Sequence, residues 1–251
     1  MSAGMQQPVF DIFDNSDALA TGLAETVSDA LAQAIAARGR AVLAVSGGST
    51  PLKFFEALSR LPLSWEQVTI MLVDERMVPA SSERSNAKLA REHLIKNQAA
   101  SAFFVPMYSG GFDDGDAAHQ IETVLKRARL TPPDFVVLGM GNDGHTASFF
   151  PGGDRLKDAI DPAQSALVLP MHADGAGEAR LTLTLPVLLA AKRLALHIEG
   201  AGKRAALDRA LADGTRAEDM PIRAVFSFRQ RIGVHQRYGF RSAEEPADRA
   251  D

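Results

Sequence analysis

The residues best suited to chemistry are an aspartate and a histidine two positions apart in a glycine-rich stretch. Asp143 and His145 belong to the sequence GMGNDGH, which begins at Gly139. Imidazole has an unperturbed pKa of about 6.5, so a histidine can act as a general base at neutral pH. A neighbouring carboxylate can fix its tautomer and stabilise the cation formed on proton uptake. The pair indicates proton transfer, although a single histidine can also be a structural residue bonded to the backbone.

A short apolar run must position this pair. Residues 135–138 read FVVL and are rich in β-branched side chains, which predicts a strand buried on both faces of a parallel sheet. In open α/β sheets, ligands bind just beyond the carboxyl ends of the strands. We therefore expect the loop that carries Asp143 and His145 to lie at a ligand site.

A second glycine loop follows a second predicted strand, residues 40–45. It reads SGGSTP from Ser46 to Pro51 and precedes a predicted helix over residues 52–59, with Thr50 expected as the cap and Pro51 at the first helical position. Backbone N–H groups beside glycines and a helix N-terminus favour anions. Gly47, Gly48, Ser49 and Thr50 thus form a candidate anion site; a tight turn without a ligand is the alternative.

Charged residues mark two further positions. Asp74, Glu75 and Arg76 directly follow the predicted strand 68–73, where desolvation is costly unless the charges are partnered. A structural ion pair and a ligand site are both open, and a shared sheet edge with the SGGSTP loop favours the ligand site. Further along, the sequence Gly-Ala-Gly-Lys places Lys203 beside a predicted helix start.

Predicted strands alternate with predicted helices along most of the chain, which indicates an α/β fold with a doubly wound, mostly parallel sheet and helices on both faces. We expect one catalytic domain over residues 1–240. The segment 241–251, mostly Ala, Glu, Asp and Arg, predicts a disordered tail.

The composition is that of an ordinary globular protein. The chain has 251 residues, 46% of them hydrophobic, and a formal net charge of −4. This charge gives no reason to expect nucleic acid or a membrane as partner, and no segment predicts a signal peptide or a membrane span. The absence of cysteine excludes disulfides and thiolate chemistry. We expect a cytoplasmic enzyme that is a monomer or a weak homo-oligomer.

Three other chemistries fit the sequence less well. The stretch from Gly139 to Gly144 matches the dinucleotide fingerprint G-x-G-x-x-G, but the Pro-Gly-Gly at 151–153 leaves little room for the helix that would hold a pyrophosphate. The remaining histidines are isolated in the sequence, so they do not show the close spacing that is typical of zinc ligands. A nucleophilic serine would need a G-x-S-x-G elbow, which does not occur. We expect neither a cofactor nor a metal.

Three motifs in order resemble the 6-phosphogluconolactonases, which belong with the glucosamine-6-phosphate isomerases and deaminases. They are SGGSTP at 46–51, DERMVP at 74–79 with Ser85-Asn86, and GMGNDGHTASFFP at 139–151. Arg180 before LTLT and the pair Gly202-Lys203 also fit the family pattern. The departures are small: Phe149-Phe150 stands where Leu-Phe is commoner, and Arg84 where an aspartate is often found.

The resemblance implies a Rossmann-like fold and metal-independent hydrolysis of 6-phospho-D-glucono-1,5-lactone to 6-phosphogluconate, in the oxidative pentose phosphate pathway. It makes His145 the base that activates water, with Asp143 in the same motif. Arg76, Arg180 and Lys203 become contacts for the substrate and its phosphate. The sequence leaves open whether Asp143 or Asp74 assists the histidine.

Two other functions remain open. The related aminosugar-phosphate deaminases share the Gly-Ser-Thr-Pro and Asp-Gly-His loops, but they typically have Asp-Glu-Tyr where this chain has Asp74-Glu75-Arg76. A non-catalytic sugar-phosphate sensor on the same fold would need an effector domain, and no segment is long enough to supply one.

Overall fold

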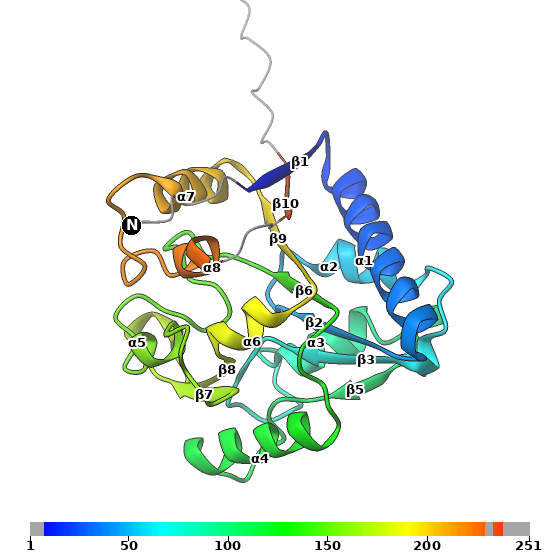
Figure 1. The fold of residues 1–251 in the computed structure, drawn as a ribbon, viewed down its shortest axis with the longest axis horizontal. Coiled ribbons are helices and arrows are strands. Elements are labelled where there is room, and N and C mark those ends of the chain that lie inside the picture. The colour runs from blue at the N-terminus through cyan, green and yellow to red at the C-terminus, as the bar shows by residue number, and fades with distance from the viewer. Residues whose placement is uncertain (1–7, 229–232, 238–251) are drawn as a thin grey trace, which may run out of the picture.

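The structure, a computed structural model, describes residues 8–228 and 233–237 (Figure 1). The strands within these ranges are β1 (Val9–Phe13), β2 (Ala41–Val45), β3 (Val68–Leu72), β4 (Asp74–Arg76), β5 (Phe103–Val105), β6 (Phe135–Leu138), β7 (Val168–Met171), β8 (Arg180–Leu183), β9 (Arg193–Glu199) and β10 (Gly233–Arg237). The α-helices are α1 (Ser16–Arg38), α2 (Leu52–Ser59), α3 (Asn86–His93), α4 (Asp114–Arg127), α5 (Leu156–Ala159), α6 (Leu185–Ala190), α7 (Ala201–Leu211) and α8 (Ile222–Phe228).

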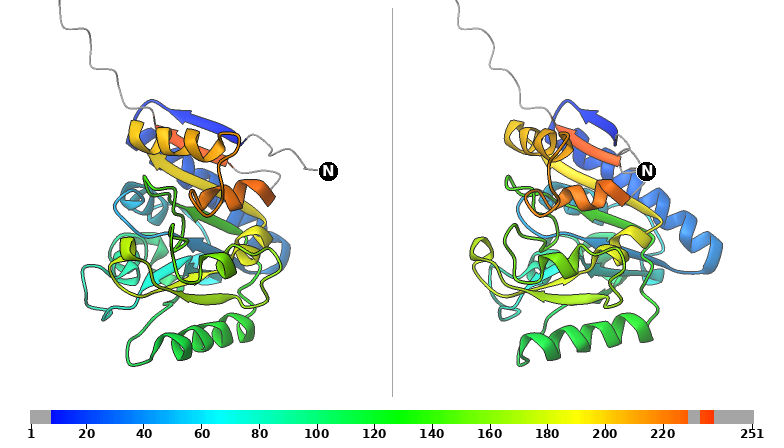
Figure 2. Two further views of the ribbon diagram at one scale, coloured as in Figure 1. Left: turned by 90° about the vertical axis from the view of Figure 1, so that its left-hand side faces the viewer. Right: turned by 60° about the vertical axis from the view of Figure 1, so that its left-hand side comes forward.

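A seven-stranded parallel sheet forms the centre of the molecule, in the order β1-β10-β9-β6-β2-β3-β5. Helices α1 to α3 lie on one side of it and α6 to α8 on the other (Figures 1 and 2). The central strands β2 and β6 are buried along their whole length, as expected for a parallel sheet covered on both faces. The predicted α/β, doubly wound architecture is confirmed.

A second sheet of three antiparallel strands, in the order β4-β8-β7, was not predicted. The charged triplet expected at the end of a strand is itself a short strand, with Arg76 opposite Arg180. The chain passes between the sheets at Val73, whose N–H donates to Val45 of β2 and whose carbonyl accepts from Leu183 of β8. A three-residue strand paired with one about a hundred residues later carries no local signal.

The strand order reverses between β2 and β6. From β2 the chain continues outward through β3 to β5, and β6 begins the opposite direction through β9 to β10. In doubly wound sheets this reversal opens a crevice at the carboxyl edge, where ligands bind. The two glycine loops follow β2 and β6, so the fold brings both to this crevice.

The ends of α1 and α2 are set by different residues. Asn15 caps α1 by accepting from the N–H of Ala18 at 2.8 Å. Gly39 ends the helix with a φ of 74°, a left-handed conformation that glycine adopts without strain. Pro51 occupies the N-cap of α2, and no side chain caps this helix. The predicted helix range of 52–59 is confirmed, but the expected cap by Thr50 is wrong, because Pro51 is the N-cap residue rather than the first helical one.

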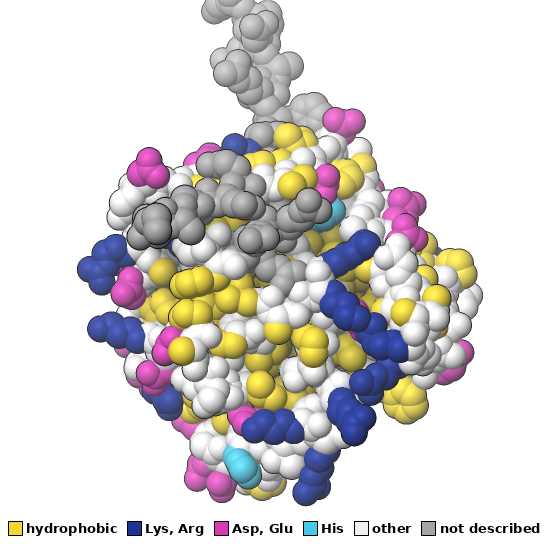
Figure 3. Space-filling view, viewed as in Figure 1, with side chains coloured by type: hydrophobic (Ala, Val, Ile, Leu, Met, Phe, Trp, Pro, Cys, Tyr) yellow, Lys and Arg dark blue, Asp and Glu magenta, His cyan; other side chains and the backbone are white. Residues whose placement is uncertain are grey.

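The surface charge is unevenly distributed. On the face in Figure 3, Lys and Arg side chains gather in a row to the right of centre. The sequence has no long Lys/Arg run, so the fold assembles this row. None of the described helices has the length and apolar character needed to cross a bilayer. The predicted tail at 241–251 lies outside the described residues.

Candidate active site

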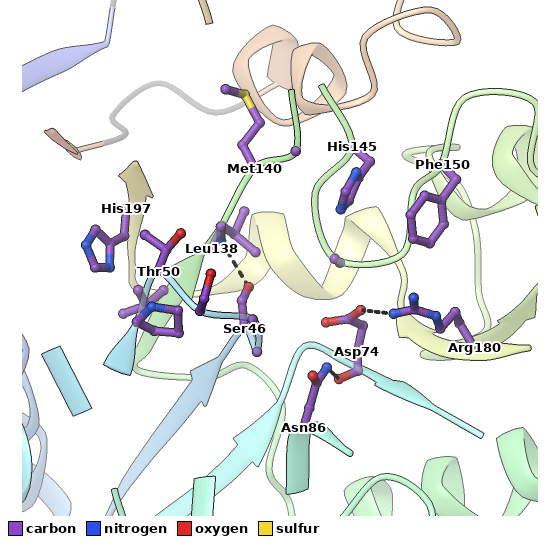
Figure 4. Close-up of a pocket in the computed structure, with 18 of the residues that line it drawn as sticks. Ser46, Thr50, Asp74, Asn86, Leu138, Met140, His145, Phe150, Arg180 and His197 are labelled. Carbon is purple, nitrogen blue, oxygen red and sulfur yellow. Dashed lines mark hydrogen bonds and ion pairs between the residues drawn. The ribbon is translucent and has the colours of Figure 1, made fainter. Parts of the chain in front are cut away.

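A cavity of about 370 Å³ opens at the carboxyl edge of the large sheet, at the strand reversal. The loops after β2 and β6 form two of its walls, and β4, β8 and α7 contribute the others (Figure 4). All but one of the residues proposed from sequence line it, namely Gly47, Gly48, Ser49, Thr50, Asp74, Arg76, His145, Arg180 and Lys203. The exception, Asp143, contacts His145.

His145 and Asp143 form a hydrogen-bonded pair. Nδ1 of His145 lies 2.6 Å from Oδ1 of Asp143, and the His145 backbone N–H donates to the same oxygen at 3.2 Å. The hydrogen bond from the ring holds the pKa of Asp143 below its ordinary value, against the effect of burial. An ionised Asp143 places the proton on Nδ1, and this tautomer leaves the lone pair of Nε2 for a substrate.

An aromatic ring supports the imidazole from the side. The ring centres of His145 and Phe150 are 4.6 Å apart at an interplanar angle of 33°. The guanidinium of Arg180 lies 5.3 Å from the centre of the same phenyl ring. Phe150 therefore contacts both the proposed base and a buried cation (Figure 4).

The loop after β6 is folded by its own backbone. The Gly141 N–H donates to the carbonyl of His145 at 2.8 Å, and the Gly144 N–H donates to the carbonyl of Gly141 at 3.1 Å. Gly144 itself has a φ of 78°. A Thr146 hydroxyl hydrogen bond to the carbonyl of Gly139, 2.8 Å long, closes the loop. The next helix, α5, begins only at Leu156. The loop thus lacks the helix N-terminus on which a dinucleotide would place its pyrophosphate.

The loop after β2 keeps its backbone donors free. The N–H groups of residues 47–50 have no hydrogen-bond acceptor among the described residues. Ser46 ties this loop to its neighbour, since its Oγ accepts from the N–H of Gly139 at 3.0 Å. Gly47 is in tight contact with Asn86: a Cβ atom there would lie 2.0 Å from Oδ1. The structure thus fits the predicted anion site, because unpaired N–H groups favour an anion.

Two arginines and an aspartate form a second polar wall. Asp74 accepts from the Ser148 hydroxyl at 2.7 Å and lies 3.9 Å from Nη1 of Arg180. Arg76 donates to the side chain of Asn86 at 3.1 Å. The Nε atoms of both arginines are buried without a hydrogen-bond partner among the described residues. Burial lowers the pKa of Arg180, and a ligand oxygen would supply the missing acceptors.

Lys203 belongs to a different part of the cavity. It lies in the first turn of α7, and its Nζ donates to the carbonyl of Met140 in the loop after β6. Burial lowers the pKa of Lys203, and the charge of Asp143 acts in the opposite direction. The three cations expected to contact the substrate and its phosphate have different neighbours. The charges of Asp74 and Arg76 act on Arg180, and the charge of Asp143 acts on Lys203.

Glu75 serves the structure rather than the cavity. Its buried carboxylate accepts from the N–H groups of Asn86 and Ala87, at 2.8 and 2.7 Å, and from the Ser85 hydroxyl at 3.1 Å. Burial raises the pKa of Glu75 despite these bonds. The middle residue of the charged triplet thus anchors the start of α3, which holds Asn86 beside Arg76.

Sequence reasoning missed some residues of the site. Phe150 and His197 line the cavity, and Ser148 donates to Asp74. No local pattern assigns them these places, because Arg180, Phe54 and Asp74, which they contact, are distant in the chain. Within the described ranges, no three His, Asp or Glu side chains are grouped so as to hold a metal ion.

The fold and site define an α/β enzyme with a histidine–aspartate pair and a glycine loop of unpaired N–H groups at the switch point of a parallel sheet. Residues 14–233 match the family of glucosamine-6-phosphate isomerases and 6-phosphogluconolactonases, and the chain belongs to this family. It is 53% identical to a 6-phosphogluconolactonase of Rhizobium meliloti over 225 residues, covering 90% of this chain and 94% of that protein. A 6-phosphogluconolactonase of Mesorhizobium japonicum is also 53% identical, over 86% of this chain and 89% of its own length.

A solved structure agrees. The crystal structure of a 6-phosphogluconolactonase from Shewanella baltica superposes with a TM-score of 0.88 at 37% identity, covering 94% of this chain and 100% of that one.

Proposed function

We propose that this protein hydrolyses 6-phospho-D-glucono-1,5-lactone to 6-phosphogluconate, as a step of the oxidative pentose phosphate pathway, without a metal ion. The observation that carries the proposal is the His145–Asp143 pair beside a cavity that is also lined by arginines, a lysine and unpaired N–H groups. Relatives at 53% identity bear the name of this activity. The substrate combines an ester carbonyl, which needs a base and an oxyanion site, with a phosphate, which needs a cationic site.

His145 acts as the general base in this mechanism. Its Nε2 takes a proton from water while the water oxygen forms a bond to the lactone carbonyl carbon. Asp143, hydrogen-bonded to Nδ1, stabilises the imidazolium. The tetrahedral intermediate then breaks its bond to the ring oxygen, which receives the proton back from Nε2. Water is consumed, a carboxylic acid and a hydroxyl group are formed, and the acid then releases a proton to solvent to give the carboxylate.

Arg180 stabilises the oxyanion. The guanidinium of Arg180 packs over the Phe150 ring, which also contacts His145. The Nε–H group of Arg180 is a donor without an acceptor among the described residues. A buried cation stabilises negative charge that develops on the carbonyl oxygen, since little water screens it. Arg76 and Asp74 complete this end of the cavity and bind the hydroxyl groups beside the carbonyl.

Lys203 and the loop at 47–50 hold the phosphate. The loop offers unpaired N–H groups ahead of a helix N-terminus, and Lys203 supplies a charge. In the loop after β6, by contrast, the N–H groups of Gly139, Gly141, Gly144 and His145 are already occupied. Binding energy from the phosphate thus positions a carbonyl at the other end of the cavity.

Lys203 and Arg180, which have different neighbours, give this proposal a direct test. Lys203→Ala should raise KM for the phosphorylated lactone and leave hydrolysis of plain gluconolactone nearly unchanged. Arg180→Gln should lower kcat on both lactones by a similar factor, in the range of about 10²–10³ found for oxyanion donors. Both are measured in a pH-stat with fresh lactone and a chelator, with spontaneous opening subtracted. Equal losses on both lactones for Lys203→Ala would refute the phosphate assignment.

The same preparation separates this function from its rival. Glucosamine 6-phosphate should release no ammonia above background. Ammonia release with little lactone turnover would instead identify a deaminase, and loss of lactone turnover on chelation would refute metal independence.

A further inference from the structure

His197 lines the cavity, and the proposed reaction does not use it. Its side chain is 3% exposed, and neither ring nitrogen has a hydrogen-bond partner among the described residues. A buried polar group without a partner has lost its hydrogen bonds to water and gained none in return, which is destabilising. Such a group beside a cavity is therefore expected to pair with the ligand that fills it.

The sheet places His197 beside the phosphate loop. It lies near the carboxyl end of β9, the strand next to β6. Its ring packs edge-on against Phe54 of α2, with 6.1 Å between the ring centres and an interplanar angle of 81°. Helix α2 follows the loop at 46–51 directly, so this contact holds the imidazole at the loop end of the cavity. Figure 4 shows His197 beside Thr50, with His145 and Arg180 on the opposite side.

A carboxylate on the same strand orients the ring. Glu199 lies two residues after His197 and therefore points to the same face of β9. Its Oε1 is 3.4 Å from Nε2 of His197, and its Oε2 accepts from the Ser16 hydroxyl at 2.5 Å. Nδ1 is thus the ring nitrogen of His197 that has no polar contact among the described residues.

We propose that His197 is a substrate-positioning residue that donates a hydrogen bond to the phosphate monoester at the loop end of the cavity. The inference rests on the proposed function for the identity of the substrate. It adds a donor opposite Lys203 and the N–H groups of residues 47–50. Because His197 lies away from His145, it contributes to binding and takes no part in proton transfer.

Variants at two neighbouring histidines test the proposal. His197→Leu removes the donor, and His197→Gln retains an N–H group on a side chain of similar length. His235 is the matched control, because it pairs with His197 in register on β10 and is equally buried, yet does not line the cavity. Thermal melting of His197→Leu and His235→Leu measures the effect of each substitution on folding.

Binding of 6-phosphogluconate and gluconate by calorimetry gives a readout that does not depend on turnover. His197→Leu should weaken 6-phosphogluconate binding about tenfold or more, as expected for a hydrogen bond to a charged group. Gluconate binding should stay within about twofold, and His197→Gln should recover most of the loss. His235→Leu should bind like the parent.

Three outcomes would overturn the proposal: unchanged 6-phosphogluconate binding in His197→Leu, an equal loss for gluconate, or an equal loss in His235→Leu. Failure of the proposed function looks different. In that case the parent protein itself would not hydrolyse the lactone, while the effect of His197 on phosphate-ester binding could still be measured.

Discussion

Replacing Gly141 with alanine is expected to break the His145–Asp143 pair while leaving both side chains in the sequence. A Cβ atom at this position would lie 2.2 Å from Nδ1 of His145 and 2.3 Å from Oδ1 of Asp143. Non-bonded atoms normally meet at roughly 3.5 Å, so both groups must move apart by about an ångström. The hydrogen bond of 2.6 Å between them cannot survive such a displacement.

The size of the effect follows from what the bond contributes. A hydrogen bond to a charged group is worth about 1.5–3 kcal/mol, and partial exposure of both side chains favours the lower end. At about 1.4 kcal/mol per factor of ten, loss of the bond alone lowers kcat about tenfold. Displacement of the base from the carbonyl adds to this, within the 10²–10⁴ that general-base catalysis supplies. We expect a total loss of about 10²-fold.

Gly139→Ala is the matched control. A Cβ atom at Gly139 would meet only Cβ of Ser46, at 3.8 Å, which is ordinary contact. This variant should keep kcat within a few-fold of the parent, measured by the pH-stat assay with the phosphorylated lactone. Equal activity of Gly141→Ala and the parent would refute the role of the pair, as would equal losses in the two alanine variants.

Three further predictions concern the loops and the charges. Gly47→Ala should unfold at a lower temperature and lose affinity for 6-phosphogluconate, because its Cβ would displace the Asn86 side chain. Gly48→Ala should lower the melting temperature less, because its Cβ would meet no atom within 4 Å and only the φ of 90° causes strain. A similar melting temperature for both would contradict this. Asp143→Asn should lower the pKa of Lys203, because the charge of Asp143 raises that pKa. NMR titration of the Lys203 side chain measures the pKa, and an unchanged value would refute the coupling. The pKa of Asp143 is lowered from 3.8 in the folded state, so its ionised form stabilises the protein above that pH. The difference in unfolding free energy between parent and Asp143→Asn should therefore shrink as the pH falls below 3.8, and a constant difference from neutral to acidic pH would contradict it.

Features specified by local sequence could be predicted. The apolar run at 135–138 and the glycines that follow it predicted both a buried strand and a loop at its end, and the structure has β6 and the cavity there. The helix at 52–59 was predicted equally locally, from the Pro51 that precedes it. In such places a single residue type or a short hydrophobic pattern determines the backbone.

Features specified by distant pairing could not be predicted. Strand β4 exists because Asp74–Arg76 pairs with residues 180–182, and no pattern within three residues reveals that partner. The same pairing explains why Arg76 and Arg180 share one wall while Lys203 lies on another. His197 stands alone in an apolar strand, so its place at the cavity depends on the strand order of the sheet.

The most direct test of the account is the turnover of the phosphorylated lactone by His145→Gln, measured together with the affinity of the same variant for 6-phosphogluconate. If His145 takes the proton from water, kcat should fall by about 10² or more, while the affinity stays within a few-fold of the parent. Turnover close to that of the parent, with binding intact, would show that another group activates the water.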